Sequence, residues 1–202
     1  MKPWGTQRIV GNMNLNIPSI QKLVEIIGGI EIDEERCLVG LCYLTGGRIS
    51  EIIGSNRYHR NMDAIKRNQF QIDTIDGHKI LKITIRTLKK RGENKNTSFR
   101  VIPIPLDIQI NKEILRLIWS YIKEFNPQEE LFDFKYTKAL RIIKKNTGWN
   151  PHWIRHIRTT HLLSVYRFKE EKVRIYMGWS DLRPLARYSE LKWVDIVSEY
   201  YN

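Results

Sequence analysis

The hydrophobic pattern of this chain changes period twice, and this limits the folds that the chain can adopt. Apolar residues first recur at helical spacing. They then alternate with polar residues in 68–74 and 79–87, on either side of Asp76-Gly77, a dipeptide typical of a hairpin turn. Residues 98–104 alternate again before helical spacing returns. The pattern predicts an α+β, mainly α fold, with helices around a small three-stranded antiparallel sheet.

Residues with preferences for helix ends divide the remainder into helices. Pro18-Ser19 is expected to open a first helix that Gly28-Gly29 closes. Asp33 is expected to cap a second helix over 34–44, and its apolar run from 37 predicts that this helix is buried. Pro103 and Pro105 are expected to end the sheet. Further helices are expected over 111–124, 135–146, 151–167, 169–177 and 190–201.

Length and charge indicate the kind of partner. The 202 residues suit one domain over 18–202, preceded by a polar arm or linker over 1–17. The chain has 34 Lys and Arg against 22 Asp and Glu, a net charge of +12. This charge favours a polyanion, with nucleic acid ahead of a membrane surface. Because the sequence has no apolar run of the ~20 residues that span a bilayer and no signal pattern, a cytoplasmic protein is expected.

The two cysteines and five histidines show no spacing typical of a metal site. Cys37 and Cys42 lie five residues apart in the predicted buried helix. There they are interpreted as small apolar core residues in a reducing compartment. We therefore expect neither a metal nor a cofactor.

Four scattered side chains are suited to holding a phosphate. His152 and Arg155 are three residues apart at the start of a helix, so both lie on one face near its positive end. Arg48 follows the break at Gly46-Gly47 and supplies a second guanidinium for the non-bridging oxygens. Trp179 offers one indole N–H, which suits a phosphate oxygen but does not shuttle protons.

A phosphodiester held in this way needs a nucleophile and an acid for its leaving group. Tyr188 suits the first role, because a phenol of pKa ~10 is a better leaving group than a sugar hydroxyl, so the linkage can be resealed without ATP. Lys89 or Lys90, in a basic loop between two predicted strands, suits the second. Lys90, Arg91 and Lys95 of the same loop are expected to bind DNA.

The order of these residues resembles the catalytic domain of the tyrosine recombinase, or phage integrase, family. Thr45-Gly46-Gly47-Arg48-Ile49-Ser50-Glu51 is similar to the first-arginine box of the family, and His152-Trp153-Ile154-Arg155-His156 to its His-x-x-Arg-His box. Gly178-Trp179 stands at the Gly-His or Gly-Trp position, with Tyr188 a short distance beyond. The second strand with Leu88-Lys89-Lys90, then Arg100-Val101-Ile102-Pro103-Ile104, resembles the lysine hairpin.

The resemblance implies an activity and its residues. The activity is site-specific recombination or integration of double-stranded DNA through a 3′-phosphotyrosyl intermediate, without metal or nucleotide. The implied catalytic residues are Arg48, Lys89, His152, Arg155, Trp179 and Tyr188, with Lys90 as the alternative to Lys89. The family usually carries a separate N-terminal DNA-clamping domain, which the first 16 residues do not supply.

The resemblance also implies self-association on DNA, as a dimer or tetramer. The apolar face of 190–201 either docks onto a neighbouring protomer or packs on the core of its own chain.

Structural readings of the same residues stay open beside the catalytic ones. Arg48 can cap its helix and pair with Glu51, Trp179 can belong to the core, and the 89–95 loop can be solvated charge. Two further functions also remain: a type IB topoisomerase-like nicking and sealing enzyme, and a catalytically silent DNA-binding regulator.

Overall fold

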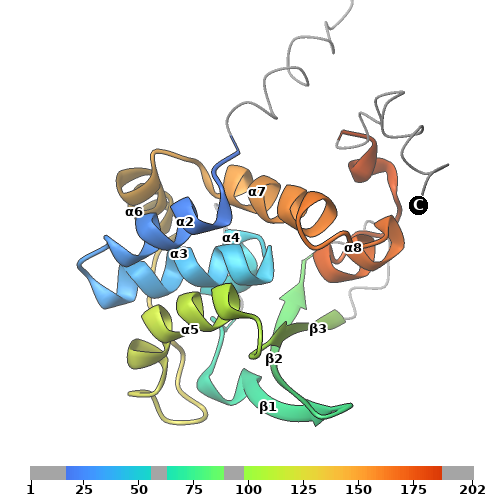
Figure 1. The fold of residues 1–202 in the computed structure, drawn as a ribbon. Coiled ribbons are helices and arrows are strands. Elements are labelled where there is room, and N and C mark those ends of the chain that lie inside the picture. The colour runs from blue at the N-terminus through green and yellow to red at the C-terminus, as the bar shows by residue number, and fades with distance from the viewer. Residues whose placement is uncertain (1–16, 56–62, 89–97, 188–202) are drawn as a thin grey trace, which may run out of the picture.

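The computed structural model describes residues 17–55, 63–88 and 98–187. Figure 1 shows a mainly helical fold beside one small sheet, which confirms the predicted fold class. The helices are α2 (Ile20–Gly28), α3 (Asp33–Thr45), α4 (Ile49–Ile53), α5 (Gln109–Ile122), α6 (Tyr136–Thr147), α7 (Pro151–Ser164) and α8 (Glu170–Met177), with the 3-10 turns η2 (Arg67–Gln69) and η3 (Arg183–Arg187).

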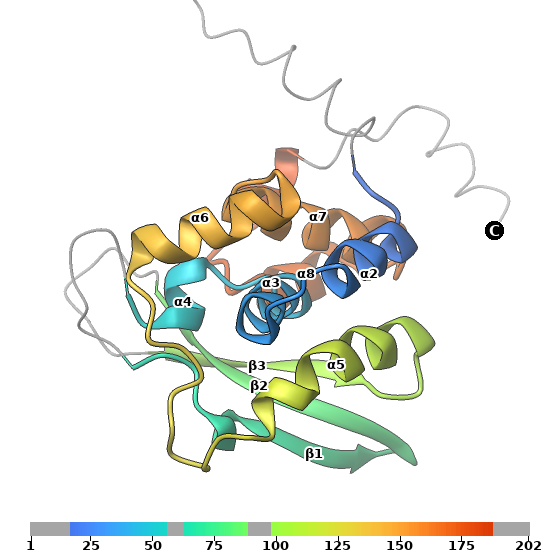
Figure 2. The same cartoon turned by 90° about the vertical axis from the view of Figure 1, so that its left-hand side faces the viewer.

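Helix α3 is the centre of the molecule. Every residue from Cys37 to Thr45 is buried, as the apolar run predicted. Helix α3 contacts α2, α4, α5, α6 and α7, and Figure 2 shows it between α5 on one side and α6 and α7 on the other. Asp33 is not the cap that the sequence predicted: it is the first residue of the helix, and Ile32 precedes it as N-cap. There the carboxylate favours the helix through the dipole instead.

The sheet has strand order β1 (Phe70–Ile75), β2 (His78–Thr87), β3 (Ser98–Pro105), and all pairs are antiparallel. Asp76 and Gly77 both have positive φ, as a type I′ hairpin turn requires. Two predictions were wrong here. Residues 68 and 69 belong to η2, and Pro103 lies within β3 opposite Lys82. Because β3 is an edge strand, a proline without an N–H is tolerated there.

The helices after the sheet confirm the predicted elements and correct some of their ends. Helix α5 begins and ends two residues early, and α7 ends at Ser164 instead of 167. Arg167 has positive φ, so the helix does not continue through it. Asn150 caps α7 by accepting a hydrogen bond from Trp153 N, and Pro151 starts the helix.

The structure confirms that both cysteines are core residues. Cys37 and Cys42 are free, fully buried thiols on α3, and burial raises the pKa of both, that of Cys42 to about 12. Within the described ranges, no helix has both the length and the apolar character to cross a membrane.

Candidate active site

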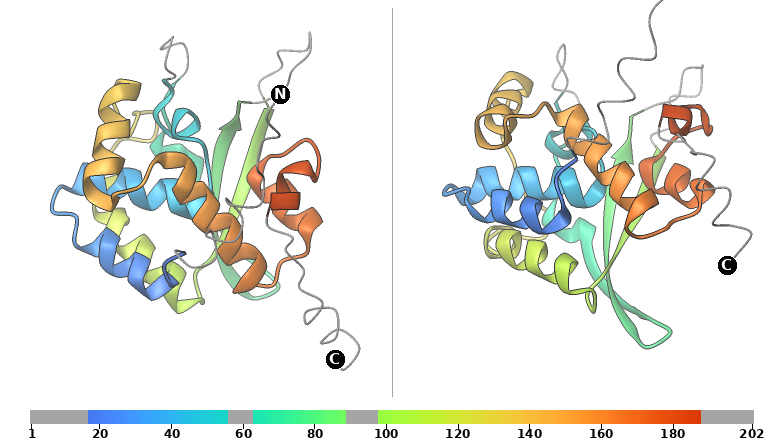
Figure 3. Two further views of the ribbon diagram at one scale, coloured as in Figure 1. Left: turned by 90° about the horizontal axis from the view of Figure 1, so that it is seen from above. Right: turned by 45° about the horizontal axis from the view of Figure 1, so that its top comes forward.

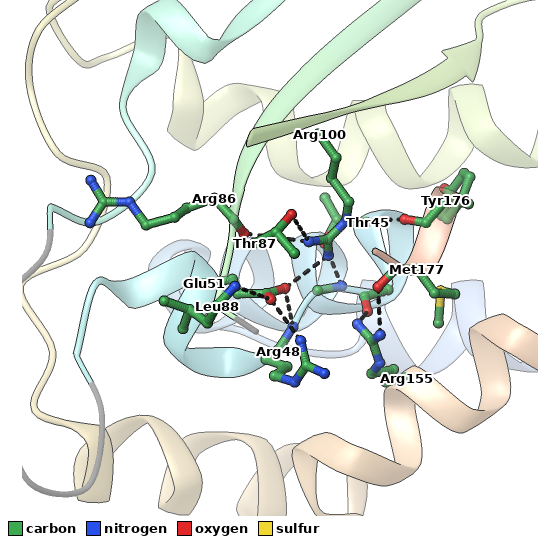
Figure 4. Close-up of polar contacts among 12 residues, drawn as sticks. Thr45, Arg48, Glu51, Arg86, Thr87, Leu88, Arg100, Arg155, Tyr176 and Met177 are labelled. Atoms are coloured by element: carbon green, nitrogen blue, oxygen red, sulfur yellow. Dashed lines mark hydrogen bonds and ion pairs between the residues drawn. The ribbon is translucent and has the colours of Figure 1, made fainter. Parts of the chain in front are cut away.

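The ends of α3, α8, β2 and β3 meet at the starts of α4 and α7, and this brings predicted site residues together. Figure 3 shows the strand ends of β2 and β3 between α4 and α8, with α7 passing close by. Figure 4 shows the side chains at this meeting point. Segments more than a hundred residues apart in sequence therefore build one polar cluster.

Arg48 is the N-cap of α4 and is about one-third exposed. Its Nη1 donates to Glu51 Oε1 at 2.9 Å, and its backbone N–H donates to Glu51 Oε2 at 2.9 Å. The structural reading of Arg48, a cap paired with Glu51, is therefore correct. The structural role of Arg48 is compatible with a catalytic role, because Glu51 is buried while part of the Arg48 side chain stays exposed to solvent.

Glu51 is fully buried and joins three segments. Besides Arg48, its carboxylate accepts hydrogen bonds from Arg100 Nη2 at 2.8 Å and from Leu88 N at 3.1 Å (Figure 4). Burial disfavours the charged form, but the two guanidinium groups outweigh this and lower the pKa of Glu51. Glu51 is therefore an anion at neutral pH that holds one catalytic candidate and the end of β2.

Arg155 is buried in the middle of the cluster. Its Nη1 donates to the carbonyl of Gly46 and its Nη2 to the carbonyl of Met177, the latter at 2.6 Å. Gly46 has φ +57, and a Cβ there would lie 2.7 Å from Met177 Sδ. Because the site leaves no room for a side chain, Gly46 allows the loop of Arg48 to meet Arg155 and α8.

Trp179 lies against Arg155, whereas His152 is exposed at the start of α7. The Trp179 ring is half-buried, with its centroid 5.5 Å from the guanidinium carbon of Arg155. His152 is exposed in the first turn of α7, with its ring centroid 6.0 Å from that of His156. His152 and Arg155 therefore share the start of one helix, as predicted, but one faces solvent and the other is buried.

Several predicted residues lie outside the described ranges. They are Lys89, Lys90, Arg91, Lys95, Tyr188 and the predicted helix 190–201. The structure describes residues close to them in sequence. Leu88 N donates a hydrogen bond to Glu51, and Leu185 of η3 is buried. Three peptide links separate Leu185 from Tyr188.

Two buried arginines of the cluster were not predicted as site residues. Arg100 bonds to Glu51, Thr87, Arg86 and Tyr176, and Arg158 bonds to the Tyr176 hydroxyl. A signal was available for each. Arg100 alternates with Ile102 and Ile104 in β3, and Arg158 lies one turn after Arg155, so the period of each element indicates an inward-pointing side chain.

The arrangement concentrates positive charge around a hydrogen-bonded frame. Arg48 and Arg155, together with the start of α7, are suited to neutralising an oxyanion such as a phosphodiester. Among the residues that the structure describes, no group of three or more His, Cys, Asp or Glu is placed to hold a metal ion.

Comparisons with known proteins identify the fold. No family model and no curated protein matches the sequence. A structure of XerH site-specific recombinase bound to difH substrate, a pre-cleavage complex, is 19% identical with a TM-score of 0.54, over 90% of this chain and 51% of that one. The post-cleavage complex with palindromic difH is 18% identical with a TM-score of 0.57, over 91% and 52%. A Tn1549 transposon integrase with a circular intermediate DNA is 18% identical with a TM-score of 0.50, over 90% and 62%.

The chain spans about half the length of the XerH recombinase that it matches. Helices around a three-stranded antiparallel sheet are the fold that they share, so the chain has the tyrosine recombinase catalytic fold.

Proposed function

We propose that this chain is the catalytic domain of a site-specific DNA recombinase or integrase. The observation that carries the proposal is that Arg155 is hydrogen-bonded to Gly46, in the same loop as Arg48. Two arginines from motifs far apart in sequence are thereby held at one place, on a fold shared with recombinases whose structures contain DNA. The charge of +12 gives the chain a further affinity for a polyanion.

In the proposed reaction, Tyr188 Oη attacks the scissile phosphorus and the bond to the 5′ oxygen breaks. His152 accepts the phenolic proton, and Lys89, or Lys90 in its place, donates a proton to the leaving oxygen. Arg48 and Arg155 neutralise the charge on the non-bridging oxygens, with Trp179 as a further donor. Rejoining is the reverse: a 5′ hydroxyl attacks the phosphotyrosine, and the tyrosine leaves without any need for ATP.

Among the tyrosines of the described part, Tyr176 is unsuited to be the nucleophile. It is buried, burial raises its pKa, and its hydroxyl bonds to Leu44 O and Arg158. This supports the choice of Tyr188, which follows Gly178-Trp179 in sequence.

The test is to trap a covalent adduct. The protein is incubated with a pool of randomised, end-labelled duplexes that each carry one nick, because the short cleaved piece then diffuses away and rejoining is blocked. Adducts that survive denaturation are isolated and their DNA is sequenced. We expect an adduct with the wild-type chain, none with Tyr188→Phe, and an undiminished one with Tyr201→Phe.

Two results would contradict the proposal: no adduct at any salt concentration or duplex length, or an adduct with Tyr188→Phe. The selected sequence then separates recombination from simple nicking and sealing. A recombinase exchanges strands between two DNA sites that both carry the selected sequence. A topoisomerase-like enzyme instead relaxes a supercoiled plasmid that lacks this sequence.

A further inference from the structure

Arg100 is a third arginine, which contacts the support of Arg48 directly and the residue next to one support of Arg155. It lies on the inner face of β3, and its side chain is 7% exposed. Nη2 donates to Glu51 Oε2 at 2.8 Å and Nε to the carbonyl of Tyr176 at 3.1 Å. Nη1 donates to Thr87 Oγ1 at 2.9 Å and to Arg86 O at 3.4 Å (Figure 4). All three guanidinium nitrogens are therefore engaged.

Two contacts of Arg100 lie next to the groups that hold Arg48 and Arg155, the two arginines proposed to clamp the phosphate. Glu51, bound by Arg100, also binds Arg48 at 2.9 Å. Tyr176, whose carbonyl accepts from Arg100, directly precedes Met177, whose carbonyl accepts from Arg155. Arg100 thus connects the support of Arg48 with the support of Arg155.

Gly178 shows how closely α8 approaches Arg100. Gly178 has φ +65, and a Cβ there would lie 2.9 Å from Arg100 Nη1 and 3.1 Å from Arg100 Cδ. The glycine before Trp179 therefore ends α8 in the left-handed conformation and leaves space for the guanidinium. Two separate features of the chain, a buried arginine and this glycine, fit the same contact.

We propose that Arg100 is a positioning residue for strand cleavage, which sets the spacing of Arg48 and Arg155 around the scissile phosphate. This inference rests on the proposed function. The alternative is a structural role, in which Arg100 only neutralises the buried charge of Glu51. Lysine separates the two roles, because an ammonium can pair with Glu51 but cannot reproduce a planar fork that bonds to four groups.

The test compares Arg100→Lys with the wild-type chain on a duplex that the wild type cleaves. Adduct formation is timed in a single turnover on the ordinary phosphodiester and on a methylphosphonate at the scissile position. The methylphosphonate lacks the non-bridging negative charge that the clamp must neutralise. Arg48→Ala, which removes one clamp arginine directly, gives the reference pattern.

The matched control is Arg36→Lys. Arg36 also donates both to a carboxylate, that of Asp33, and to backbone carbonyls, those of Ile30 and Glu31, at the far end of α3 from Gly46. The Arg36→Lys variant should cleave the phosphodiester and the methylphosphonate duplexes at the wild-type rates.

For Arg100→Lys we expect phosphodiester cleavage to slow by at least about 30-fold, since misplacing a clamp by an ångström can cost ~100-fold. On the methylphosphonate the deficit should shrink to a few fold, as for Arg48→Ala. DNA affinity should be unchanged, and the melting temperature should fall by no more than about 4 °C, the shift that ~1 kcal/mol gives.

An unchanged rate on the phosphodiester, or the same deficit on both linkages, would overturn the positioning role. If the wild type itself forms no adduct, the proposed function fails, and that result is distinct from either of these.

Discussion

Arg158 donates a hydrogen bond from Nη2 to the hydroxyl of Tyr176 at 2.7 Å, in a fully buried site of the candidate active-site region. Its guanidinium carbon lies 5.0 to 5.4 Å from the ring centroids of Tyr43, Tyr166 and Tyr176. Within the described part of the chain, its Nε and Nη1 have no hydrogen-bond partner and no carboxylate pairs with it. The cation is therefore stabilised by aromatic faces and one hydroxyl.

This arrangement predicts opposite effects for two substitutions. Tyr176→Phe removes the hydroxyl and leaves a buried cation less satisfied, so it should lower the free energy of unfolding by about 1–3 kcal/mol. Arg158→Met removes the desolvated charge and keeps the volume apolar, so it should be neutral or stabilising. Urea unfolding measures both. If Arg158→Met lowers the free energy of unfolding as much as Tyr176→Phe, the three tyrosine rings and the hydroxyl stabilise the Arg158 cation by more than its desolvation costs.

Glu51→Gln should destabilise the protein and change its acid sensitivity. Removing one partner of a buried ion pair leaves the other charge uncompensated, and the expected loss is about 3 kcal/mol. Because the folded pKa of Glu51 is lowered, its stabilising effect is present above the unfolded pKa of ~4.3 and is lost as pH falls through the folded value. The wild type should therefore lose more stability than the variant below about pH 4.

Melting temperatures of both chains from pH 6 to pH 3 check this. Glu25→Gln is the control, since its pair with Lys22 is exposed and should change stability by less than about 1 kcal/mol. Parallel acid profiles for wild type and Glu51→Gln would refute the assignment.

His161 should make the fold sensitive to mild acid. Its Nδ1 bonds to the Tyr43 hydroxyl and its Nε2 to the carbonyl of Pro18, both at 2.9 Å. Since a carbonyl only accepts, Nε2 carries the proton and Nδ1 accepts from Tyr43. Burial, together with the nearby Arg158 cation, lowers the pKa of His161 despite the bond to Pro18.

The unfolded chain therefore binds a proton more readily than the folded one, so stability should fall as pH drops below the unfolded value of ~6.5. Melting curves between pH 7.5 and 5.5 should show this slope in the wild type and a shallower one in His161→Gln. Equal slopes would mean that His161 does not titrate in this range.

Helix α6 should add to non-specific DNA affinity. It packs against α4 and α7, which carry Arg48 and Arg155, and its exposed face presents Arg141 and Lys144. If each contacts one phosphate, Arg141→Ala with Lys144→Ala should reduce the slope of log K against log salt by about 1.8.

Binding to a duplex at several salt concentrations gives this slope. Lys112→Ala with Lys123→Ala removes the same charge from α5 and its C-cap, across α3 from α6 (Figure 2). This pair should leave a steeper slope than the α6 pair. Identical slopes for the two double variants would mean that α6 contributes only its net charge.

Local patterns predicted most of the elements, because their signals lie within a few residues of each other. The apolar run of α3, the Asp76-Gly77 turn and the start of α7 at residue 151 are examples. At Pro103 the error fell where a distant contact decides the extent of the strand. Pro103 stays in β3 because Lys82 lies opposite it on β2, and nothing beside Pro103 in sequence reveals that partner.

The candidate site divides in the same way. The sequence by itself determined which residues are candidates for the chemistry: Arg48, His152, Arg155 and Trp179 were identified from residue type, spacing and order. Their catalytic roles, like those of Lys89 and Tyr188, are predictions. Only the tertiary structure decided how these side chains are held. A buried carboxylate, Glu51, and two buried arginines, Arg100 and Arg158, connect the segments that carry the site. Their roles depend on hydrogen-bond partners up to 76 residues away, and such contacts are fixed by the packing of the core rather than by any local pattern.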